Sequence, residues 1–324
     1  MSVLLIYERG FVTVKKTRRE LWKLYILAVI CTMLWGSAIP TIKLGYDVFN
    51  IAPAATADKL VFAGVRFLGA GLLILVPFRI FSKNIVMEKG AFRHSLILGL
   101  IQTTGQYFFM YVGLAYTTGV NTSVFNAVGT LLYIVLAWII YRDEKVSKIK
   151  VLGCSIGFFG ILLNSLATQQ MGIFSFKGDG FVIISSICVA IGFLYSKHCV
   201  QNTNPFLLTG MQMGFGGLVL LAVGLFLGGT LPTVTSGGMA LLLYLMLVSA
   251  VAFSLWTLLL KEYSASLVGV FNFLTPVFGA VFSYVLSSLG FLNEASAFTA
   301  YTVLAIILAA GGILLSSISN TKNI

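Results

Sequence analysis

The chain has 324 residues, of which 58% are hydrophobic and only 10% are charged, and its formal net charge is +11. Soluble domains carry about 25% charged residues, so this composition excludes an ordinary soluble protein. The positive charge does not indicate a nucleic-acid-binding domain, because such a domain needs a basic patch on a folded soluble face. Here the basic residues fall between long apolar stretches. We therefore expect an integral membrane protein.

Ten apolar stretches follow one another along the chain. A helix needs about 20 apolar residues to cross a hydrocarbon layer of about 30 Å, so each stretch predicts one membrane-spanning helix. The expected fold class is all-α integral membrane, with ten transmembrane helices. The predicted helices cover residues 24–44, 60–81, 95–116, 120–141, 149–167, 180–199, 206–228, 238–260, 265–288 and 297–318.

Residues 1–23 precede the first helix and are predicted to form a cytoplasmic arm. They carry six basic residues and run into the helix without a small-residue cleavage site, so a cleaved signal peptide is not expected. Trp35 lies near the middle of the first helix, far from the membrane interfaces where tryptophan is common. It is therefore a candidate for lining or gating a central cavity.

Arg66 lies in the second helix, about 9 Å below its predicted outer end at about 1.5 Å per residue. One interpretation is electrostatic attraction of a carboxylate or phosphate at the outer mouth. The other is that the side chain reaches the outer headgroups or pairs with Asp47 or Asp58. The depth favours the second interpretation, but an intramembrane charge is often functional, so both stay open.

The third helix carries Gln102, Gln106 and Tyr107, and Gln106 lies near its middle. An amide without a partner in hydrocarbon costs several kcal/mol, so these side chains must face another helix or a wet cavity. Binding of a solute and hydrogen bonding between helices explain them equally well.

Asn126 and Asn272 stand at matching places in the fourth and ninth helices. They suit either a clamp on a substrate or a structural cross-link between the two helices, and the structural role is favoured. Tyr195 in the sixth helix and Trp256 in the eighth complete the predicted cavity residues. Trp256, like Trp35, lies deeper than the interfacial belt.

Basic residues alternate between the two sides of the membrane. Seventeen of the 21 lysines and arginines fall on the side of the N-terminal arm, and only Lys43, Lys59, Arg66 and Lys177 fall on the other. Basic loops stay in the cytoplasm, so both termini are predicted to be cytoplasmic. Most of this bias comes from the first half of the chain, which we expect to set the orientation.

The two halves of the chain repeat a series of landmarks. Tyr116 and Tyr263 are 147 residues apart, Asn126 and Asn272 are 146 apart, and similar offsets link Glu144 to Glu294 and Gly160 to Gly312. Five helices are an odd number, so the second copy would enter the membrane from the opposite side. Inverted repeats of this kind are typical of transporters that work by alternating access. The predicted organisation is a first repeat at 24–167, an outer loop at 168–177, a second repeat at 178–318 and a cytoplasmic tail at 319–324.

Several short motifs resemble one known family. They are Met33-Leu34-Trp35-Gly36-Ser37, Lys43-Leu44-Gly45, Arg66-Phe67, Gly113-Leu114-Ala115-Tyr116-Thr117, Phe271 to Val277 and Asn293-Glu294. Together they resemble the drug/metabolite transporter superfamily, and within it the EamA-type carriers with ten helices, over roughly residues 24–318. The resemblance implies a prokaryotic inner-membrane carrier with a central cavity that exports amino acids, other metabolites or drugs. Thr130 stands where the second copy has Pro276, so a kink expected in the ninth helix should be softer in the fourth.

Acidic residues are expected only near helix ends, and proton-coupled carriers usually keep an acid inside the membrane. We therefore predict no carboxylate proton relay. The sequence has no nucleotide-binding loop, no metal-ligand spacing among its cysteines and no nucleophile with a neighbouring base. We expect no enzymatic activity, no cofactor, no metal site and no nucleic-acid partner. The predicted partners are a small solute and membrane lipid, and a homodimer is left open.

The predicted function is an inner-membrane secondary transporter for amino acids or similar amphipathic solutes, with export as the expected direction. A cavity with amides and aromatic rings but without acids favours neutral, zwitterionic or weakly anionic solutes over organic cations. A multidrug or organic-cation efflux carrier is the alternative, and a membrane sensor or assembly subunit without transport activity is a further one.

Overall fold

The computed structural model describes residues 18–81, 90–141, 147–168, 172–233, 235–291 and 299–321. Across these residues every regular element is a helix. Eight of the helices in the described ranges are long and apolar enough to cross a membrane. The protein is therefore a multi-pass helical membrane protein, as the composition predicts.

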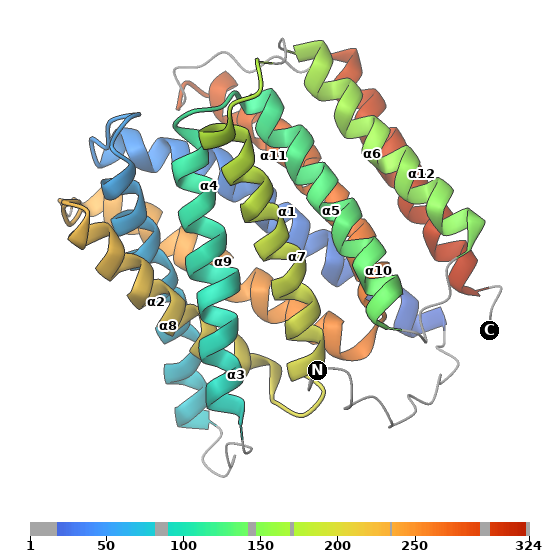
Figure 1. Cartoon of the computed structure of the whole chain (residues 1–324), viewed down its shortest axis with the longest axis horizontal. Coiled ribbons are helices and arrows are strands. Elements are labelled where there is room, and N and C mark those ends of the chain that lie inside the picture. The colour runs from blue at the N-terminus through green and yellow to red at the C-terminus, as the bar shows by residue number, and fades with distance from the viewer. Residues whose placement is uncertain are drawn as a thin grey trace.

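The helical elements follow one another with short connections (Figure 1). In chain order they are α1 (Arg18–Val48), α2 (Thr56–Phe81), α3 (Ala91–Leu98), the π-helix η1 (Gly99–Gly105), α4 (Gln106–Leu114), α5 (Gly119–Ile140), α6 (Lys148–Thr168), the π-helix η2 (Phe176–Gly180), α7 (Phe181–Cys199), α8 (Pro205–Phe226), α9 (Ser236–Glu262), α10 (Ala265–Val270), the 3₁₀ turn η3 (Phe271–Phe273), α11 (Leu274–Ser288) and α12 (Ala300–Thr321).

Several helices extend beyond the predicted apolar stretches. α1 begins at Arg18, inside the predicted arm, and α2 begins at Thr56 rather than at residue 60. α12 continues to Thr321, into the predicted tail. Counting apolar residues misses such polar turns, because helix ends are set by capping and not by hydropathy. Asn204 illustrates this, since its side chain accepts hydrogen bonds from the first amides of α8, directly before Pro205.

The segment Ala91–Leu114 is helical throughout but changes type in its middle. The π-helix η1 separates α3 from α4. Such π segments widen the backbone locally and often occur at functional sites. The hydropathy pattern predicts a single plain helix here and carries no signal for this change.

The helix predicted to kink near Pro276 changes type just before that residue. Proline has no amide hydrogen to bond the carbonyl four residues earlier, which here belongs to Asn272. The chain forms the 3₁₀ turn η3 at this point, between α10 and α11. At the matching position α5 has Thr130, and it runs unbroken from Gly119 to Ile140.

Two helix pairs flank the bundle, α2 with α8 on one side and α6 with α12 on the other (Figure 1). Both pairs touch through glycine. A Cβ atom added to Gly71 would lie 2.4 Å from the amide nitrogen of Gly214, and one on Gly153 would lie 2.4 Å from the carbonyl oxygen of Gly312. Only glycine lets the backbones approach this closely, so both pairs depend on glycine for their close packing.

The centre of the bundle lies between these flanking pairs. Here α1 packs against α9 and α11, while α7 packs against α4, η1 and α5. Most of the buried apolar side chains of the described residues belong to one core cluster that runs through these elements.

Candidate functional site

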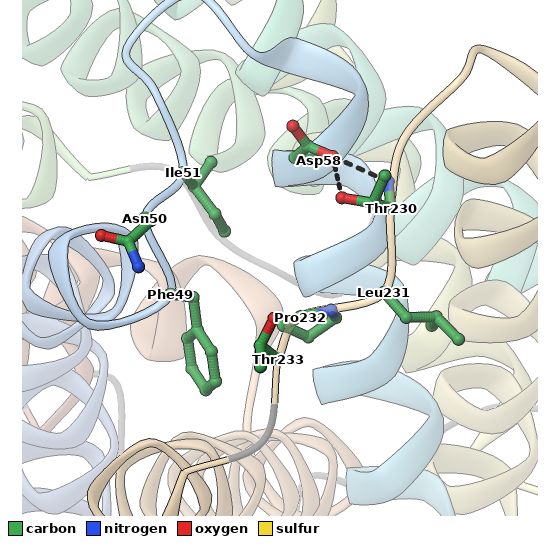
Figure 2. A pocket seen from close by; sticks show the side chains of 8 residues that line it. All are labelled: Phe49, Asn50, Ile51, Asp58, Thr230, Leu231, Pro232 and Thr233. Carbon is green, nitrogen blue, oxygen red and sulfur yellow. Dashed lines mark hydrogen bonds between the residues drawn. The ribbon is translucent and has the colours of Figure 1, made fainter.

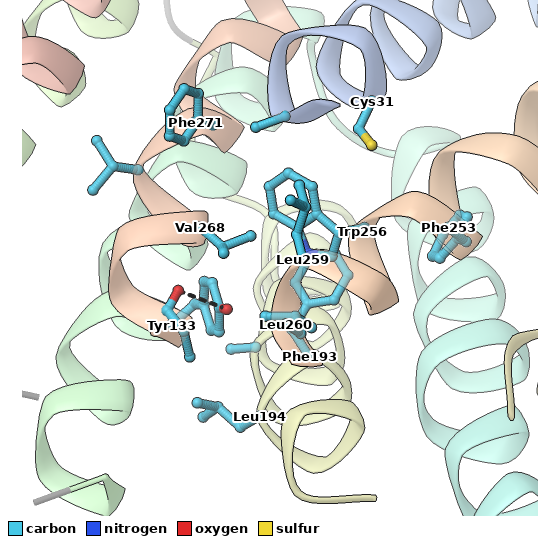
Figure 3. Close-up of a cluster of buried hydrophobic side chains, with 14 of the residues drawn as sticks. Cys31, Tyr133, Phe193, Leu194, Phe253, Trp256, Leu259, Leu260, Val268 and Phe271 are labelled. Carbon is cyan, nitrogen blue, oxygen red and sulfur yellow. Dashed lines mark hydrogen bonds between the residues drawn. The ribbon is translucent and has the colours of Figure 1, made fainter. Parts of the chain in front are cut away.

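Four aromatic side chains meet at the centre of the bundle: Trp35 from α1, Phe193 from α7, and Phe253 and Trp256 from α9. We call them the central aromatic cluster. The ring centroids of Trp35 and Trp256 are 4.9 Å apart, those of Trp35 and Phe253 are 5.2 Å apart, and those of Phe193 and Trp256 are 5.5 Å apart. Figure 3 shows Trp256 above Phe193, with Phe253 on the neighbouring turn of α9. Two of the predicted cavity residues, Trp35 and Trp256, are therefore in direct contact.

The spacing of α9 explains why its side chains converge. Ser249, Phe253 and Trp256 follow one another at intervals of four and three residues, which places them on one face of the helix. Trp256 is 1% exposed. The indole nitrogens of Trp35 and Trp256 are buried and have no hydrogen-bond partner among the described residues. The cluster is therefore apolar in its rings but carries two N–H donors without acceptors.

Arg66 lies inside the bundle and not at an open mouth. Its side chain is 2% exposed, and its Nε donates a hydrogen bond of 2.9 Å to the Ser249 hydroxyl. The guanidinium carbon is 4.9 Å from the centroid of the Phe67 ring. Since α2 begins at Thr56, Arg66 is about 15 Å along the helix at about 1.5 Å per residue.

The sequence suggested that Arg66 either reaches the outer headgroups or pairs with Asp47 or Asp58, and neither agrees with this geometry. A side chain this buried does not reach the headgroups. Within the described residues no carboxylate lies at ion-pair distance from it. Asp58 instead accepts hydrogen bonds of 2.7 and 3.0 Å from the amide and hydroxyl of Thr230. The helix also begins four residues earlier than predicted, at Thr56, so Arg66 lies further along it than expected.

Tyrosines surround the Phe67 side of Arg66. The Tyr107 ring is 4.3 Å from the Phe67 ring and 6.1 Å from that of Tyr111. Phe67 is 6.5 Å from Phe253 and joins this group to the central aromatic cluster. The structure thus brings Arg66, Tyr107, Trp35 and Trp256 into one connected region.

The two predicted glutamines lie on the α7 side of this region. Gln102 is buried, and its side chain packs on Gly192, where a Cβ atom would come within 2.8 Å of it. Gln106 is half-buried, and its backbone carbonyl accepts a hydrogen bond of 2.8 Å from Ser185.

The two predicted asparagines each bond a neighbouring helix. The Asn126 side-chain oxygen accepts a hydrogen bond of 3.1 Å from Ser186 on α7. Asn272 donates one of 2.9 Å to Thr130 on α5, and so joins η3 to that helix.

Tyr195 lies apart from the other predicted site residues. Its hydroxyl is 2.6 Å from Nδ1 of His94, and its ring stacks on His198. It packs against a small separate cluster that includes Cys199 and Leu208. The structure therefore does not bring Tyr195 to the central aromatic cluster.

One end of the bundle is tied together around Asp179, which is fully buried. One of its oxygens accepts hydrogen bonds from the hydroxyl of Thr117 and from the Asn121 amide, the latter of 3.0 Å. The other oxygen accepts a bond of 2.6 Å from the backbone amide of Ser175. We call Thr117, Asn121, Ser175 and Asp179 the Asp179 cluster, and it joins the end of α4 and the start of α5 to the segment before α7.

The opposite end is joined around Glu262, at the end of α9. Lys23 of α1 forms an ion pair with Glu262 at 2.8 Å. The Tyr263 hydroxyl donates a bond of 2.6 Å to the carbonyl of Glu20, and Lys197 of α7 donates one of 2.7 Å to the carbonyl of Tyr263. Burial, followed by the charges of Glu262 and Glu20, raises the pKa of Tyr263 to about 12, so its hydroxyl stays a donor. We call these five residues the Glu262 cluster.

A pocket of about 70 Å³ lies between the α1–α2 and α8–α9 connections (Figure 2). Its walls include Asn50, Asp58 and Thr230. None of the predicted site residues lines it, so we do not assign the solute site there.

Sequence analysis missed several residues that complete the central region. Phe193, Phe253 and Ser249 are unremarkable apolar or small residues in apolar helices. The interval from Ser249 through Phe253 to Trp256 is the one signal that pointed to a shared face. Asp179 was expected only as an acid at a helix end, and nothing in its neighbours along the chain indicates three hydrogen-bond donors.

The chain matches a known family over nearly its whole length. The model of the EamA-like transporter family matches residues 22–166 and again residues 176–318.

Individual relatives have similar lengths. The chain is 26% identical to the uncharacterized transporter YyaM of Bacillus subtilis, over 82% of this chain and 86% of that protein. It is 26% identical to an uncharacterized transporter of Archaeoglobus fulgidus, over 91% of this chain and 97% of that protein. A solved structure, described only as the crystal structure of a protein, superposes with a TM-score of 0.73 at 15% identity and covers 92% of this chain and 97% of the other. The last likeness shows a shared fold.

Proposed function

Because the chain belongs to the EamA-like transporter family, we propose that it is a secondary transporter that moves small metabolites across a prokaryotic plasma membrane by alternating access. Family membership confirms the resemblance drawn from the sequence motifs. The proposed solutes are amino acids or similar amphipathic molecules, and the proposed direction is export.

The proposal includes ten crossings arranged as two inverted repeats. Eight spans meet the length and hydropathy expected of a crossing. The continuous helical segment Ala91–Leu114 and α12 would supply the other two. The two stretches matched by the family model, 22–166 and 176–318, are close to the two proposed repeats. The first turn of α1 and the last turn of α12 lie on the same side of the bundle (Figure 1), which suits an even number of crossings.

The observation that carries the proposal is a packing pattern that repeats with the roles of the halves exchanged. α1 packs against α9 and α11 of the second half, while α7 packs against α4 and α5 of the first. The pairs α2 with α8 and α6 with α12 each join equivalent helices of the two proposed repeats. A two-fold axis in the membrane plane would generate this pattern, and such an axis lets two repeats exchange conformations around a central site.

The central region would hold the solute. It combines the central aromatic cluster with Arg66 and Tyr107. The acidic residues that the structure describes, such as Glu262 and Asp179, lie near helix ends and away from this region. Aromatic walls with a few convergent polar groups are typical of small-molecule sites. A site of this composition would favour amphipathic metabolites over organic cations, which would need a buried acid.

We propose that both termini are cytoplasmic, because most basic residues of the sequence fall on that side. In this orientation the Glu262 cluster is cytoplasmic and the Asp179 cluster faces outward. Cysteine labelling of Lys43→Cys and Lys261→Cys in cells with an impermeant maleimide tests the orientation. Labelling of the first position alone is expected, and labelling of the second alone would reverse the topology.

The transport proposal is tested with the purified protein in proteoliposomes. We expect saturable uptake of a labelled amphipathic amino acid such as phenylalanine, and we expect unlabelled solute inside the vesicles to accelerate it. A quaternary-ammonium dye in place of the amino acid tests the multidrug alternative. Selective movement of the dye would favour that alternative, and the absence of saturable flux for every solute would contradict a carrier.

A further inference from the structure

Arg66 is a buried charge that the described part of the chain does not neutralise. Its Nε is bonded to the Ser249 hydroxyl, its guanidinium stacks near Phe67, and its Nη1 is buried without a hydrogen-bond partner. The single ion pair within the described residues joins Lys23 to Glu262 and does not involve it. A guanidinium in a dry interior is normally paired with a carboxylate or phosphate, because desolvation of an unpaired charge is costly.

Two further unsatisfied polar atoms of this region are donors only. The Nε1 atoms of Trp35 and Trp256 are buried without acceptors, and an indole N–H can only donate. Together with Arg66 Nη1 they make three buried N–H donors, while the nearby hydroxyls of Tyr46 and Ser254, also buried without a partner among the described residues, can donate or accept. A site with this surplus is complementary to a ligand that brings acceptor oxygens.

We propose that Arg66 binds a carboxylate of the transported solute, and that the solute is an amphipathic organic monocarboxylate whose apolar part lies against the central aromatic cluster. This inference rests on the proposed transport function and narrows its solute class. A carboxylate matches the planar fork of a guanidinium and forms two parallel hydrogen bonds with it.

The path from Arg66 to the cluster has the length of a small molecule. Ser249, which holds Arg66, and Trp256 lie on one face of α9, seven residues apart, which is about 10 Å at about 1.5 Å per residue. Phe253 lies between them on the same face, and its ring centroid is 6.5 Å from that of Phe67. A carboxylate on Arg66 would place a chain of several carbons and a ring along this face.

The charge distribution favours a solute with a carboxylate over an organic cation. Among the described residues, carboxylates occur near helix ends, as in Glu262 and Asp179, and none lies beside the central aromatic cluster to pair with a cation that lacks its own carboxylate. A solute with a carboxylate and an apolar body therefore satisfies Arg66 and contacts the aromatic rings. The aromatic faces attract cations weakly, so an aromatic amine is the alternative ligand against which the carboxylate is compared.

Three ligands of similar shape distinguish an anionic, a neutral and a cationic solute. 3-Phenylpropanoate carries the carboxylate, 3-phenylpropanamide is its neutral isostere, and 2-phenylethylamine carries a cation on a similar body. Binding to the purified full-length protein is measured by titration calorimetry. We expect the carboxylate to bind at least about tenfold more tightly than the amide, because a buried charged hydrogen-bonded pair is strongly favoured over its truncated form. This comparison uses the unaltered protein, so it does not depend on the folding of a variant.

Substitutions of Arg66 test whether this residue causes the preference for carboxylate over amide. Arg66→Gln should abolish the preference for carboxylate over amide, and Arg66→Lys should keep part of it, since lysine retains the charge without the fork. Lys43→Gln is the matched control, because it removes an exposed positive charge from α1. It should leave the preference unchanged.

Two results would overturn the inference. One is equal or weaker binding of the carboxylate relative to the amide or amine in the unaltered protein. The other is a carboxylate preference that survives in a folded Arg66→Gln variant. Flux measurements separate these failures from failure of the transport proposal. Saturable transport of the amine or amide would keep the transporter and reject the role of Arg66, whereas Arg66-dependent carboxylate binding without flux would reject transport alone.

Discussion

The Asp179 end and the Glu262 end of the bundle are held by different kinds of contact. Asp179 is fully buried and receives hydrogen bonds from two side chains and one backbone amide. The ion pair of Lys23 and Glu262 is accessible to water, with the two side chains 46% and 33% exposed. In the proposed repeat the two ends are equivalent, because each joins the loop before the fourth helix of one copy to the first helix of the other. Two backbone carbonyls also accept hydrogen bonds at the Glu262 end, from Lys197 and Tyr263. Because its one ion pair is exposed and therefore weak, we expect this end to open at lower cost than the Asp179 end.

The largest expected effect comes from holding the weaker end closed. In a cysteine-free variant, Lys23→Cys with Glu262→Cys is linked by a short bismaleimide. Because alternating access requires each end to open in turn, the link should abolish exchange of solute in proteoliposomes. Lys23→Cys alone, treated with the same reagent, should transport normally. Undiminished exchange in the linked protein would show that this end does not open during transport.

The next largest effect is expected from a variant that weakens the hydrogen bonds of the Asp179 cluster. Asp179→Asn places an amide N–H₂ among donors that now face a carboxylate, so at least one buried hydrogen bond is lost. Charged hydrogen bonds contribute about 1.5–3 kcal/mol, and we expect unfolding to become easier by about 2–4 kcal/mol. Thermal unfolding in detergent measures the change. Glu262→Gln is the partner variant, and an equal loss at both positions would remove the proposed difference between the ends.

A smaller effect is expected inside the Glu262 cluster. Lys197 is 9% exposed and its ammonium donates to the Tyr263 carbonyl. Lys197→Met keeps the length of the side chain but removes this bond, at a cost of about 1–3 kcal/mol in unfolding free energy. Lys261→Met, which removes an exposed charge next to Glu262, should cost little. If the two variants unfold at the same temperature, the buried bond contributes nothing to this end.

The smallest effect concerns the exposed ion pair. Glu262→Gln should lower stability by less than about 1 kcal/mol, because exposed pairs are weak and screened by salt. The difference between this variant and the unaltered protein should shrink further as salt increases. Unfolding temperatures at low and high ionic strength measure it. A loss that does not respond to salt would mean that the pair is shielded from water, contrary to its exposure.

The sequence predicted the membrane class, the approximate helix positions and an irregularity near Pro276, because hydropathy and proline act locally. It placed the start of α2 four residues too late, because the polar first turn carries no hydropathy signal. The π-helix η1 and the contact of Trp35 with Trp256 depend on packing between distant segments, and a single sequence does not reveal such pairings. The contact of Tyr195 with His94, which places this tyrosine away from the central aromatic cluster, depends on such packing too.

The 3₁₀ turn at Phe271–Phe273 has a consequence for the conformation that the empty protein prefers between transport cycles. Its counterpart, α5, is a continuous helix, so the two copies are not interchangeable at this position. In the alternating-access scheme two unequal copies give two orientations of unequal energy, and the empty protein would thus prefer one of them.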